Sequence, residues 1–402
     1  MKILISHPTS NQFNRYSLQA LSEKKILLKF VTSVNFDITK YPLKVFPRRL
    51  KSFLNKRSFK SINKEKIITN SLLTESIRYL KNKILNIHDT YKLYNDIDLL
   101  TASFIKKKKS NINAVYCYED CAYNTFIAAR NNNIKCIYEL PIGYWREKDK
   151  ILKKENKFYK NFKIPLNIES VEKLKRKDLE LKYADIIVVP SLFVKKTLLK
   201  SKFKKKKIIV IPYGFPEPKK KVNWYNKNKK LELLYVGSLT PRKGLYYLSK
   251  AIKKLYITDK DKFTLTIIGS GPLEKWLKKE LPNAIFKKNL PHNIILKEMQ
   301  SKDVLIFPSL FEGFGLVITE AMSRGMVVMS TNRTILPEIR GKNNSVLIRN
   351  NNSNDIVNNV RYFFKYPHKA KIIGQNATLA CRNNSWFKYK KNFINMTNKI
   401  HE

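Results

Sequence analysis

Hydrophobic residues along the chain gather in short runs that alternate with longer amphipathic segments. The runs have the length of buried strands, and the segments between them carry apolar residues at the spacing of one helix face. Alternation of this kind favours parallel sheets joined by crossover helices, and therefore an α/β fold. The predicted strands are KILIS (2–6), AVYCY (114–118), IKCIYEL (134–140), ADIIVVPS (184–191), LELLYVG (231–237), FTLTIIGSGP (263–272) and DVLIFPS (303–309).

The alternation breaks at residues 216–230. This segment, PEPKKKVNWYNKNKK, is proline-led, polar and charged, which is typical of a linker between domains. A chain of 402 residues is also long enough for two domains. We therefore expect a first domain at residues 1–215 and a second at residues 216–384.

A short internal repeat supports two similar domains. YADIIVVPSLFVKKTLL, from Tyr183, and SKDVLIFPSLFEGFGLVITEAM, from Ser301, share an aspartate, an apolar strand, the letters Pro-Ser-Leu-Phe and a following helix. Both domains are thus expected to be Rossmann-like. Ligands of such sheets bind beyond the carboxyl ends of the strands, so the natural site is the cleft between the domains.

Two glutamates, Glu312 and Glu320, lie within one of the most apolar segments of the chain. A buried carboxylate without partners is costly, so both side chains either reach the surface or face a cleft that uses them. The following helix is expected to begin near Leu316, where its amides favour an anion, and Gly313 and Gly315 allow a close backbone approach. The segment suits a nucleotide sugar, with the diphosphate at the amides and the hydroxyl groups of sugar and ribose on the carboxylates.

A second motif, YVGSLTPRKGLYYL, follows the first strand of the second domain. That strand is expected to end at Gly237, and Arg242 and Lys243 precede a helix opened by Gly244. Two cations at the same rim of the sheet would neutralise a leaving diphosphate. Taken alone, the motif equally suits a solvated basic turn.

Together these motifs resemble the retaining GT-B glycosyltransferases of family 4, the group 1 type. The shared marks are IPYGF at 211–215, the Gly…Lys-Gly turn, IIGSGP at 267–272, and two glutamates separated by seven residues with EGFGL at the head. The resemblance implies a GT-B fold and transfer of a hexosyl unit from a nucleoside-diphosphate sugar with retention of configuration. It also implies that a last helix, within residues 385–402, crosses back to the first domain.

The resemblance further implies a role for each matching residue. Glu312 would contact the donor sugar near the reacting carbon, while Lys243 and Arg242 would hold the diphosphate; these three are the catalytic candidates. Glu320 would bind the ribose. The remaining donor-binding candidates are Gly313, Phe314, Gly315, Leu316 and Val317 after one strand, and Gly237 and Ser238 after the other.

The chain departs from the family pattern at two places. Family members usually carry an arginine directly after the strand glycine, where this chain has Ser238, so Arg242 would have to take its role. The usual glycine pair of the first loop is also replaced, by HPTSNQF. This leaves His7, Asn11 and Gln12 as candidates for donor contact.

The acceptor side is expected on the first domain. YED (118–120) and YELPIGYWR (138–146) follow strands there and supply the candidates Glu119, Asp120 and Glu139. Asp120 equally suits a helix N-cap.

No metal ion or other cofactor is expected. The strings Asp96-Ile-Asp98 and Asp259-Lys260-Asp261 resemble the cation sites of glycosyltransferases with another fold, but their surroundings place both at the surface. His292 is either close to the nucleobase or an ordinary loop histidine. The four cysteines match no disulfide framework or zinc spacing, which suits a reducing compartment.

The charge is extreme, because 80 basic and 31 acidic residues give a formal net charge of +49. Either genome composition or an anionic partner can account for it. Aromatic and basic residues alternate at residues 41–90, which suggests attachment to an anionic membrane. The residues concerned are Arg48, Arg49, Lys51, Lys56, Arg57, Phe46, Phe53 and Phe59.

No apolar run reaches the roughly 18–20 residues of a membrane span, and the N-terminus lacks the pattern of a signal peptide. The sequence thus favours a cytoplasmic protein at the inner face of the membrane. The expected partners are a nucleotide sugar, a saccharide or lipid-linked acceptor and the anionic membrane surface, and no nucleic acid. Two other functions remain open: a sugar-nucleotide epimerase of the same fold, and a basic nucleic-acid-binding protein.

Overall fold

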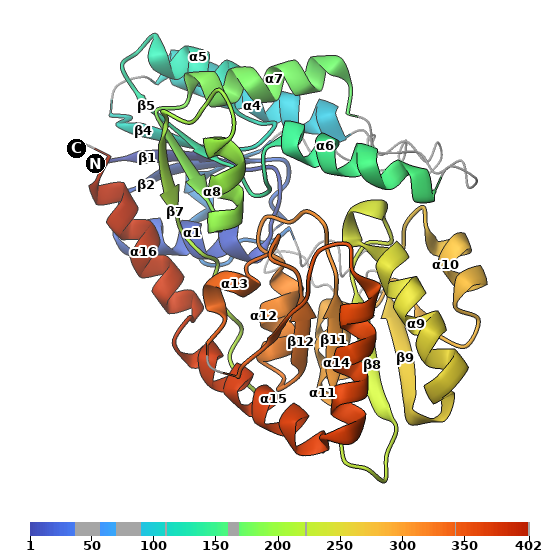
Figure 1. Ribbon diagram of the computed structural model, residues 1–402. Coiled ribbons are helices and arrows are strands. Elements are labelled where there is room, and N and C mark those ends of the chain that lie inside the picture. Colours follow the sequence, from blue (N-terminus) through green and yellow to red (C-terminus); the bar gives the residue numbers. More distant parts are fainter. Residues whose placement is uncertain are drawn as a thin grey trace.

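The structure is a computed structural model that describes residues 1–36, 57–69, 90–108, 111–159, 169–221, 223–341 and 343–400. Within these ranges the chain forms two parallel sheets, each flanked by helices, in two domains that lie one above the other (Figure 1). The predicted α/β fold with two Rossmann-like domains is confirmed.

The first domain is built on a seven-stranded sheet in the order β3-β2-β1-β4-β5-β6-β7. Its strands are β1 (Ile3–Ser6), β2 (Leu27–Thr32), β3 (Ile67–Thr69), β4 (Ala114–Tyr118), β5 (Lys135–Glu139), β6 (Ile186–Val189) and β7 (Lys207–Val210). Its helices are α1 (Gln12–Glu23), α4 (Thr90–Lys107), α5 (Tyr123–Arg130), α6 (Trp145–Glu155), α7 (Val171–Tyr183) and α8 (Leu192–Leu199), with 3-10 turns η2 (Lys64–Lys66) and η3 (Asn156–Phe158).

The second domain is built on a six-stranded sheet in the order β10-β9-β8-β11-β12-β13. Its strands are β8 (Leu231–Val236), β9 (Phe263–Ile268), β10 (Ile285–Lys287), β11 (Val304–Phe307), β12 (Val327–Ser330) and β13 (Val346–Leu347). Its helices are α9 (Leu245–Asp259), α10 (Glu274–Glu280), α11 (His292–Ser301), α12 (Leu316–Met322), α13 (Leu336–Ile339), α14 (Ser353–Lys365) and α15 (Pro367–Arg382), with 3-10 turns η5 (Pro241–Lys243) and η6 (Lys260–Lys262).

The inner strands are largely buried on both faces, as their continuous apolar runs predicted, whereas the edge strands β3, β7, β10 and β13 are partly exposed. In β1, Ile3 and Ile5 belong to the core that includes α1, whereas Leu4 between them belongs to the core that includes α4 and α5. This period of two divides the first domain into two apolar layers around one sheet.

The last helix, α16 (Trp386–Asn398), leaves the second domain and packs against α1 of the first (Figure 1). The Ser17 and Tyr389 hydroxyl groups are hydrogen-bonded at 2.7 Å, and the Lys390 ammonium group lies 2.8 Å from the Glu23 carboxylate. The chain thus passes twice between the domains. At the crossing, the amide of Phe215 donates to the carbonyl of Asn384 at 2.8 Å.

The two segments of the internal repeat, which begin at Tyr183 and Ser301, meet at the domain interface. Ser191 donates a hydrogen bond from Oγ to the Gly313 carbonyl at 2.5 Å, and the rings of Phe193 and Phe311 lie edge to face at 5.4 Å. A Cβ atom on Gly313 would come within 1.6 Å of the Pro141 carbonyl oxygen, so only glycine allows this backbone approach. The interface joins corresponding loops of the two domains.

Asp98 caps α5 from a neighbouring helix. Its carboxylate accepts hydrogen bonds from the amides of Asn124 (2.7 Å) and Thr125 (2.8 Å) and pairs with Arg176 at 2.6 Å. Asp98 is fully buried, so its expected surface position is wrong. The alternative of Asp120 as an N-cap is also wrong, because Ala122 occupies the N-cap position of α5 and its side chain makes no capping hydrogen bond.

Asp98→Ala should lower the free energy of unfolding by roughly 3–5 kcal/mol, because it removes two helix caps and leaves Arg176 short of a partner. Urea denaturation of the full chain measures this. Asp96→Ala, on the same helix but half-buried, serves as the control and should change stability by about 0.5 kcal/mol or less. Equal effects of the two substitutions would contradict a capping role for Asp98.

Candidate functional site

The order of strands in the second domain brings the two predicted motifs together. β8 lies between β9 and β11. The connection after β8 runs to β9 on one side, and the connection after β11 runs to β12 on the other side. A crevice at such a switch point is the usual ligand site of a parallel sheet. The two loops are hydrogen-bonded directly, because the amide of Leu310 donates to the carbonyl of Arg242 at 2.8 Å.

Glu312 is buried between the two predicted cations. Its Oε1 atom accepts from Arg242 Nη1 at 2.9 Å, from Ser309 Oγ at 2.8 Å, and from the Lys243 ammonium group. Burial alone would raise the pKa of Glu312, but Arg242 and Lys243 outweigh it and lower that pKa to about 2. The structure therefore joins the three catalytic candidates in one charged cluster.

Lys243 is held in place by its surroundings as well as by charge. Its ammonium group lies 4.8 Å from the centre of the Phe307 ring, and its side chain is largely buried. The next residue, Gly244, has φ +70° and would bring a Cβ atom within 2.0 Å of the Pro308 carbonyl oxygen. Glycine is thus required for the Lys-Gly turn to pack on the loop after β11.

The loop from Gly313 to Val317 only partly fits the expected donor contacts. The close approach at Gly313 is taken up by the first domain, so its predicted donor contact is corrected to an interdomain contact. The Phe314 side chain is buried, and its carbonyl accepts from the amide of Ile335 at 3.0 Å.

The helix begins at Leu316, as predicted. Gly315 is its N-cap residue, with φ +86°, and no side chain caps the helix. Leu316 and Val317 are half-buried in its first turn. The amides in this first turn are therefore not capped by a side chain of the N-cap residue.

Glu320, a turn inside α12, pairs with a histidine that the sequence left undecided. Its Oε1 atom lies 2.8 Å from Nε2 of His292 at the start of α11. Nearly half of the His292 side chain is exposed, whereas that of Glu320 is mostly buried. The described partner of Glu320 is thus His292, whereas Glu312 pairs with Arg242 and Lys243.

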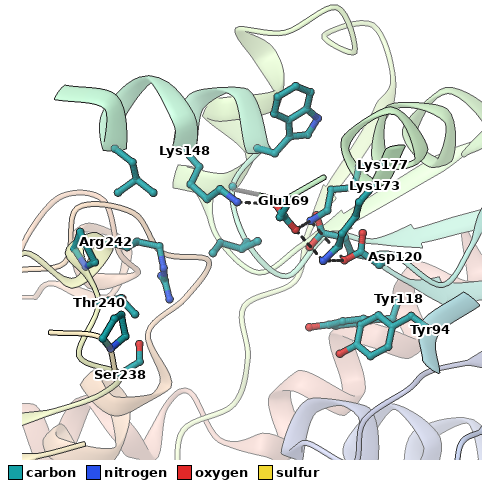
Figure 2. A pocket seen from close by; sticks show the side chains of 17 residues that line it. Tyr94, Tyr118, Asp120, Lys148, Glu169, Lys173, Lys177, Ser238, Thr240 and Arg242 are labelled. Atoms are coloured by element: carbon teal, nitrogen blue, oxygen red, sulfur yellow. Dashed lines mark hydrogen bonds and ion pairs between the residues drawn. The ribbon is translucent and has the colours of Figure 1, made fainter. Parts of the chain in front are cut away.

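A cavity of about 450 Å³ lies between the two domains, and Arg242 is part of its wall (Figure 2). The second domain contributes Ser238, Thr240 and Arg242 to its wall, and Gly237 immediately precedes them at the end of β8. The volume is within the range of about 300–1,000 Å³ typical of small-molecule sites. The cavity thus begins at the charged cluster and extends toward the first domain.

The first domain faces this cavity with residues that the sequence predicted and residues that it missed. Glu119 and Asp120 were predicted, and both line the wall. Lys148, Lys173 and Lys177 were not; Lys173 lies four residues after Glu169 and Lys177 four residues further, a spacing that indicates a shared helix face but not a cavity. Figure 2 shows these groups opposite Arg242.

The candidates of the first loop occupy structural positions. His7 is fully buried, its Nδ1 atom accepts from the amide of Thr9 at 3.1 Å, and burial lowers its pKa to about 3. Asn11 is the N-cap of α1 and accepts from the amide of Asn14, while Gln12 is the first residue of the helix. Donor contact by His7 is corrected to a core position, whereas donor contact by the half-buried Asn11 and Gln12 stays a prediction.

Glu139 is buried and does not line the cavity. It lies 3.9 Å from His7, accepts from the Tyr213 hydroxyl at 3.3 Å, and has its pKa raised to about 8 by burial. The prediction of acceptor contact by Glu139 is therefore corrected.

Among the described residues, no group of three or more His, Cys, Asp or Glu side chains is placed to hold a metal ion. Asp261 is exposed, as predicted, whereas Asp259 is 8% exposed and pairs with Lys262 and Arg361 at 2.8 and 3.0 Å. All four cysteines are free and buried.

Most of the basic and aromatic residues expected to contact a membrane lie outside the described residues: Phe46, Arg48, Arg49, Lys51, Phe53 and Lys56. Arg57 donates to the Pro8 carbonyl at 2.9 Å, and Phe59 is buried in the core, so Phe59 is not available for insertion. Within the described ranges, no helix has both the length and the apolar character needed to cross a bilayer.

Comparison with known proteins finds a family match within the second domain. Residues 216–380 match the family described as "Glycosyl transferases group 1". An uncharacterised glycosyltransferase of Methanocaldococcus jannaschii is 30% identical over 165 residues, which are 39% of this chain and 44% of that protein. The chain thus matches less than half the length of this relative.

Solved structures extend the likeness to both domains. A sucrose-phosphate synthase from Thermosynechococcus elongatus has a TM-score of 0.65 at 15% identity, covering 99% of this chain and 98% of its own. Anabaena HepE, solved in complex with UDP, has a TM-score of 0.61 at 14% identity, covering 99% and 100%. Together these comparisons support the two-domain GT-B fold.

The charged cluster predicts how stability depends on pH. The pKa of Glu312 falls from 4.5 to about 2 on folding, so its ionised form stabilises the fold by roughly 3 kcal/mol above pH 4.5, and this contribution is lost as the pH falls toward 2. Glu312→Gln should therefore reduce the unfolding free energy most at pH 7 and much less at pH 3.

Urea denaturation at the two pH values measures the difference. Glu274→Gln, which removes the partner of a surface lysine in the same domain, should change little at either pH. A Glu312→Gln effect of the same size at pH 7 and pH 3 would show that the charge of Glu312 is not what stabilises the cluster.

Proposed function

We propose that this protein is a glycosyltransferase that moves a hexosyl unit from a nucleoside-diphosphate sugar to a saccharide acceptor, with retention of configuration. The observation that carries the proposal is the cluster of Glu312, Arg242 and Lys243 at the switch point of the second sheet, next to the interdomain cavity. Such a cluster offers cations where a diphosphate would leave.

The comparisons support the donor side of this proposal. The family match covers the domain that holds the cluster, and the similarly folded Anabaena HepE binds UDP. We assign the diphosphate to Arg242, Lys243 and the first amides of α12, and the ribose to Glu320. The retaining mechanism and the family 4 assignment follow from the motif resemblance.

The proposed reaction proceeds on one face of the sugar. As the bond to the diphosphate lengthens, positive charge develops on the anomeric carbon and negative charge on the leaving oxygen. Arg242 and Lys243 stabilise the leaving oxygen, and the departing phosphate takes the proton of the acceptor hydroxyl. Glu312 holds both cations in position through its ion pairs and, with its negative charge, favours the positive sugar.

The acceptor is proposed to be a growing polysaccharide or a lipid-linked saccharide at the inner face of the membrane. A chain with a net charge of +49 is attracted to anionic lipid, which would bring it to such an acceptor. We propose a peripheral association of this kind.

A sugar-nucleotide epimerase is the second candidate function, because it would use the same fold and the same diphosphate contacts. The product distinguishes the two enzymes. An epimerase releases a free sugar without any acceptor, whereas a transferase forms a new glycosidic bond.

The proposal is tested by incubating the full chain with a panel of nucleoside-diphosphate hexoses, with and without saccharide acceptors, in the presence of EDTA. We expect slow donor hydrolysis alone and a glycoside product with acceptor, both unaffected by the chelator. Absence of turnover with every donor would overturn the proposed function, and activity that EDTA abolishes and Mn²⁺ restores would overturn its metal-free form.

Removal of either cation should slow catalysis more than it weakens nucleotide binding, because their charge matters most as the diphosphate leaves. We expect Lys243→Ala and Arg242→Ala each to lower kcat by roughly 10²–10³-fold, measured by steady-state kinetics. Lys279→Ala, an exposed lysine of the same domain, is the control and should match the wild type. Wild-type behaviour of Arg242→Ala alone would assign the phosphate role to Lys243 only.

Glu320→Gln should weaken donor binding by roughly 1.5–3 kcal/mol, because the amide keeps the shape of the carboxylate but loses its charge-assisted acceptors for the ribose hydroxyl groups. Calorimetry with the matching nucleotide measures this, and circular dichroism checks the fold. His292→Gln removes the observed partner of Glu320 and should cost less. If both variants lose the same affinity, Glu320 acts only by positioning His292.

A further inference from the structure

The first-domain wall of the cavity is a network of ion pairs. Lys148 and Lys173 lie 2.7 and 2.9 Å from the Glu169 carboxylate, and Lys177 lies 3.1 Å from it and 3.0 Å from Glu119. Burial alone would raise the pKa of Glu169, but the three ammonium groups lower it below its ordinary value. The wall therefore presents fixed charges that already compensate one another.

Asp120 stands out within this network. Its side chain lines the cavity and is 8% exposed, and its Oδ2 atom lies 3.1 Å from the Lys173 ammonium group (Figure 2). Its other oxygen, Oδ1, is buried and has no hydrogen-bond partner among the described residues. A buried carboxylate oxygen without a donor is costly, and such a group calls for a ligand or another explanation.

The backbone at Asp120 is also unusual. Its φ angle is +68°, in the left-handed region that residues other than glycine adopt less often. Its amide is held there by Glu180, a fully buried carboxylate, at 2.9 Å. The same turn brings the Ala122 amide within 3.0 Å of Glu180, so its backbone is fixed and the Asp120 side chain is held at the cavity wall.

The balance of charge in the cavity indicates what kind of ligand fits. On the first-domain wall, three ammonium groups face three carboxylates. A phosphate or carboxylate group bound at this wall would have to displace these ion pairs. A hydroxyl group needs only an acceptor, which Oδ1 of Asp120 offers.

Aromatic rings complete the wall. Tyr94 and Tyr118 point into the cavity beside Asp120, with ring centres 6.4 Å apart, and Trp145 also lines it (Figure 2). Rings provide apolar surface for the C–H face of a sugar, while fixed charges bind its hydroxyl groups.

We propose that this cavity binds the terminal sugar of an uncharged saccharide acceptor, and that Asp120 selects it by accepting a hydrogen bond from one of its hydroxyl groups. The inference rests on the proposed function and names the acceptor class for the same cleft. Because the terminal torsion of an aspartate is soft, either carboxylate oxygen could take the hydroxyl while Lys173 holds the other. Asp120 is thus a specificity residue, distinct from the cluster around Glu312.

Saturation-transfer NMR on the full chain tests the proposal, with uncharged methyl hexosides as probes and their 6-phosphates and uronates as matched anionic probes. We expect at least one methyl hexoside to bind at least tenfold more tightly than its anionic counterparts. Asp120→Asn should weaken that binding at least tenfold and change the affinity for nucleoside diphosphates by less than twofold. Asparagine tolerates the left-handed backbone, so this variant should fold.

Asp96→Asn is the matched control, because Asp96 lies in the same domain and does not line the cavity; it should bind every probe as the wild type does. Tighter binding of the phosphorylated or uronate probes, no binding of any methyl hexoside, or wild-type affinity in Asp120→Asn would each overturn the inference. These outcomes leave the proposed function standing, since donor turnover decides that separately.

Discussion

Every pairing between the named strands in the described part of the chain is parallel, and the rest of the architecture depends on this constraint. Parallel strands need crossover helices, and the loops that follow the strands all emerge at one edge of the sheet. Two such sheets, facing one another, present both sets of loops to one cleft. The loops after β8 and β11, more than sixty positions apart in the chain, therefore come to share a hydrogen bond between Leu310 and Arg242.

At that edge, three charged side chains lie beside an apolar sheet and lower one another's electrostatic cost. Two cations beside an apolar sheet would repel one another, and a lone carboxylate there would lose its hydration. Placing Glu312 between Arg242 and Lys243 compensates the carboxylate and reduces the repulsion between the cations, and it leaves one positive charge in excess. The cations are therefore already oriented before any ligand arrives. Pre-oriented charge of this kind costs no reorganisation during a reaction, which is why a buried cluster suits catalysis better than flexible surface lysines.

The sequence was most informative where a pattern has a direct physical meaning. Apolar runs and helical spacing predicted the α/β fold, and the rule that strand ends share an edge predicted that Glu312, Arg242 and Lys243 would meet. Contacts between distant helices carry no such local signal. Nothing in the letters around Asp98 shows that it caps α5, and nothing around His7 shows that its side chain is fully buried. The spacing of Glu169, Lys173 and Lys177 was readable, but it looks the same on an exposed helix as on a cavity wall.

The double passage of the chain between the domains has a mechanical consequence. The two connecting segments run side by side and are hydrogen-bonded to each other at Phe215 and Asn384, and α16 anchors the second of them on α1. Because the two segments are bonded to each other, they form one joint between the domains and not two separate tethers. A change at either segment is therefore felt by both.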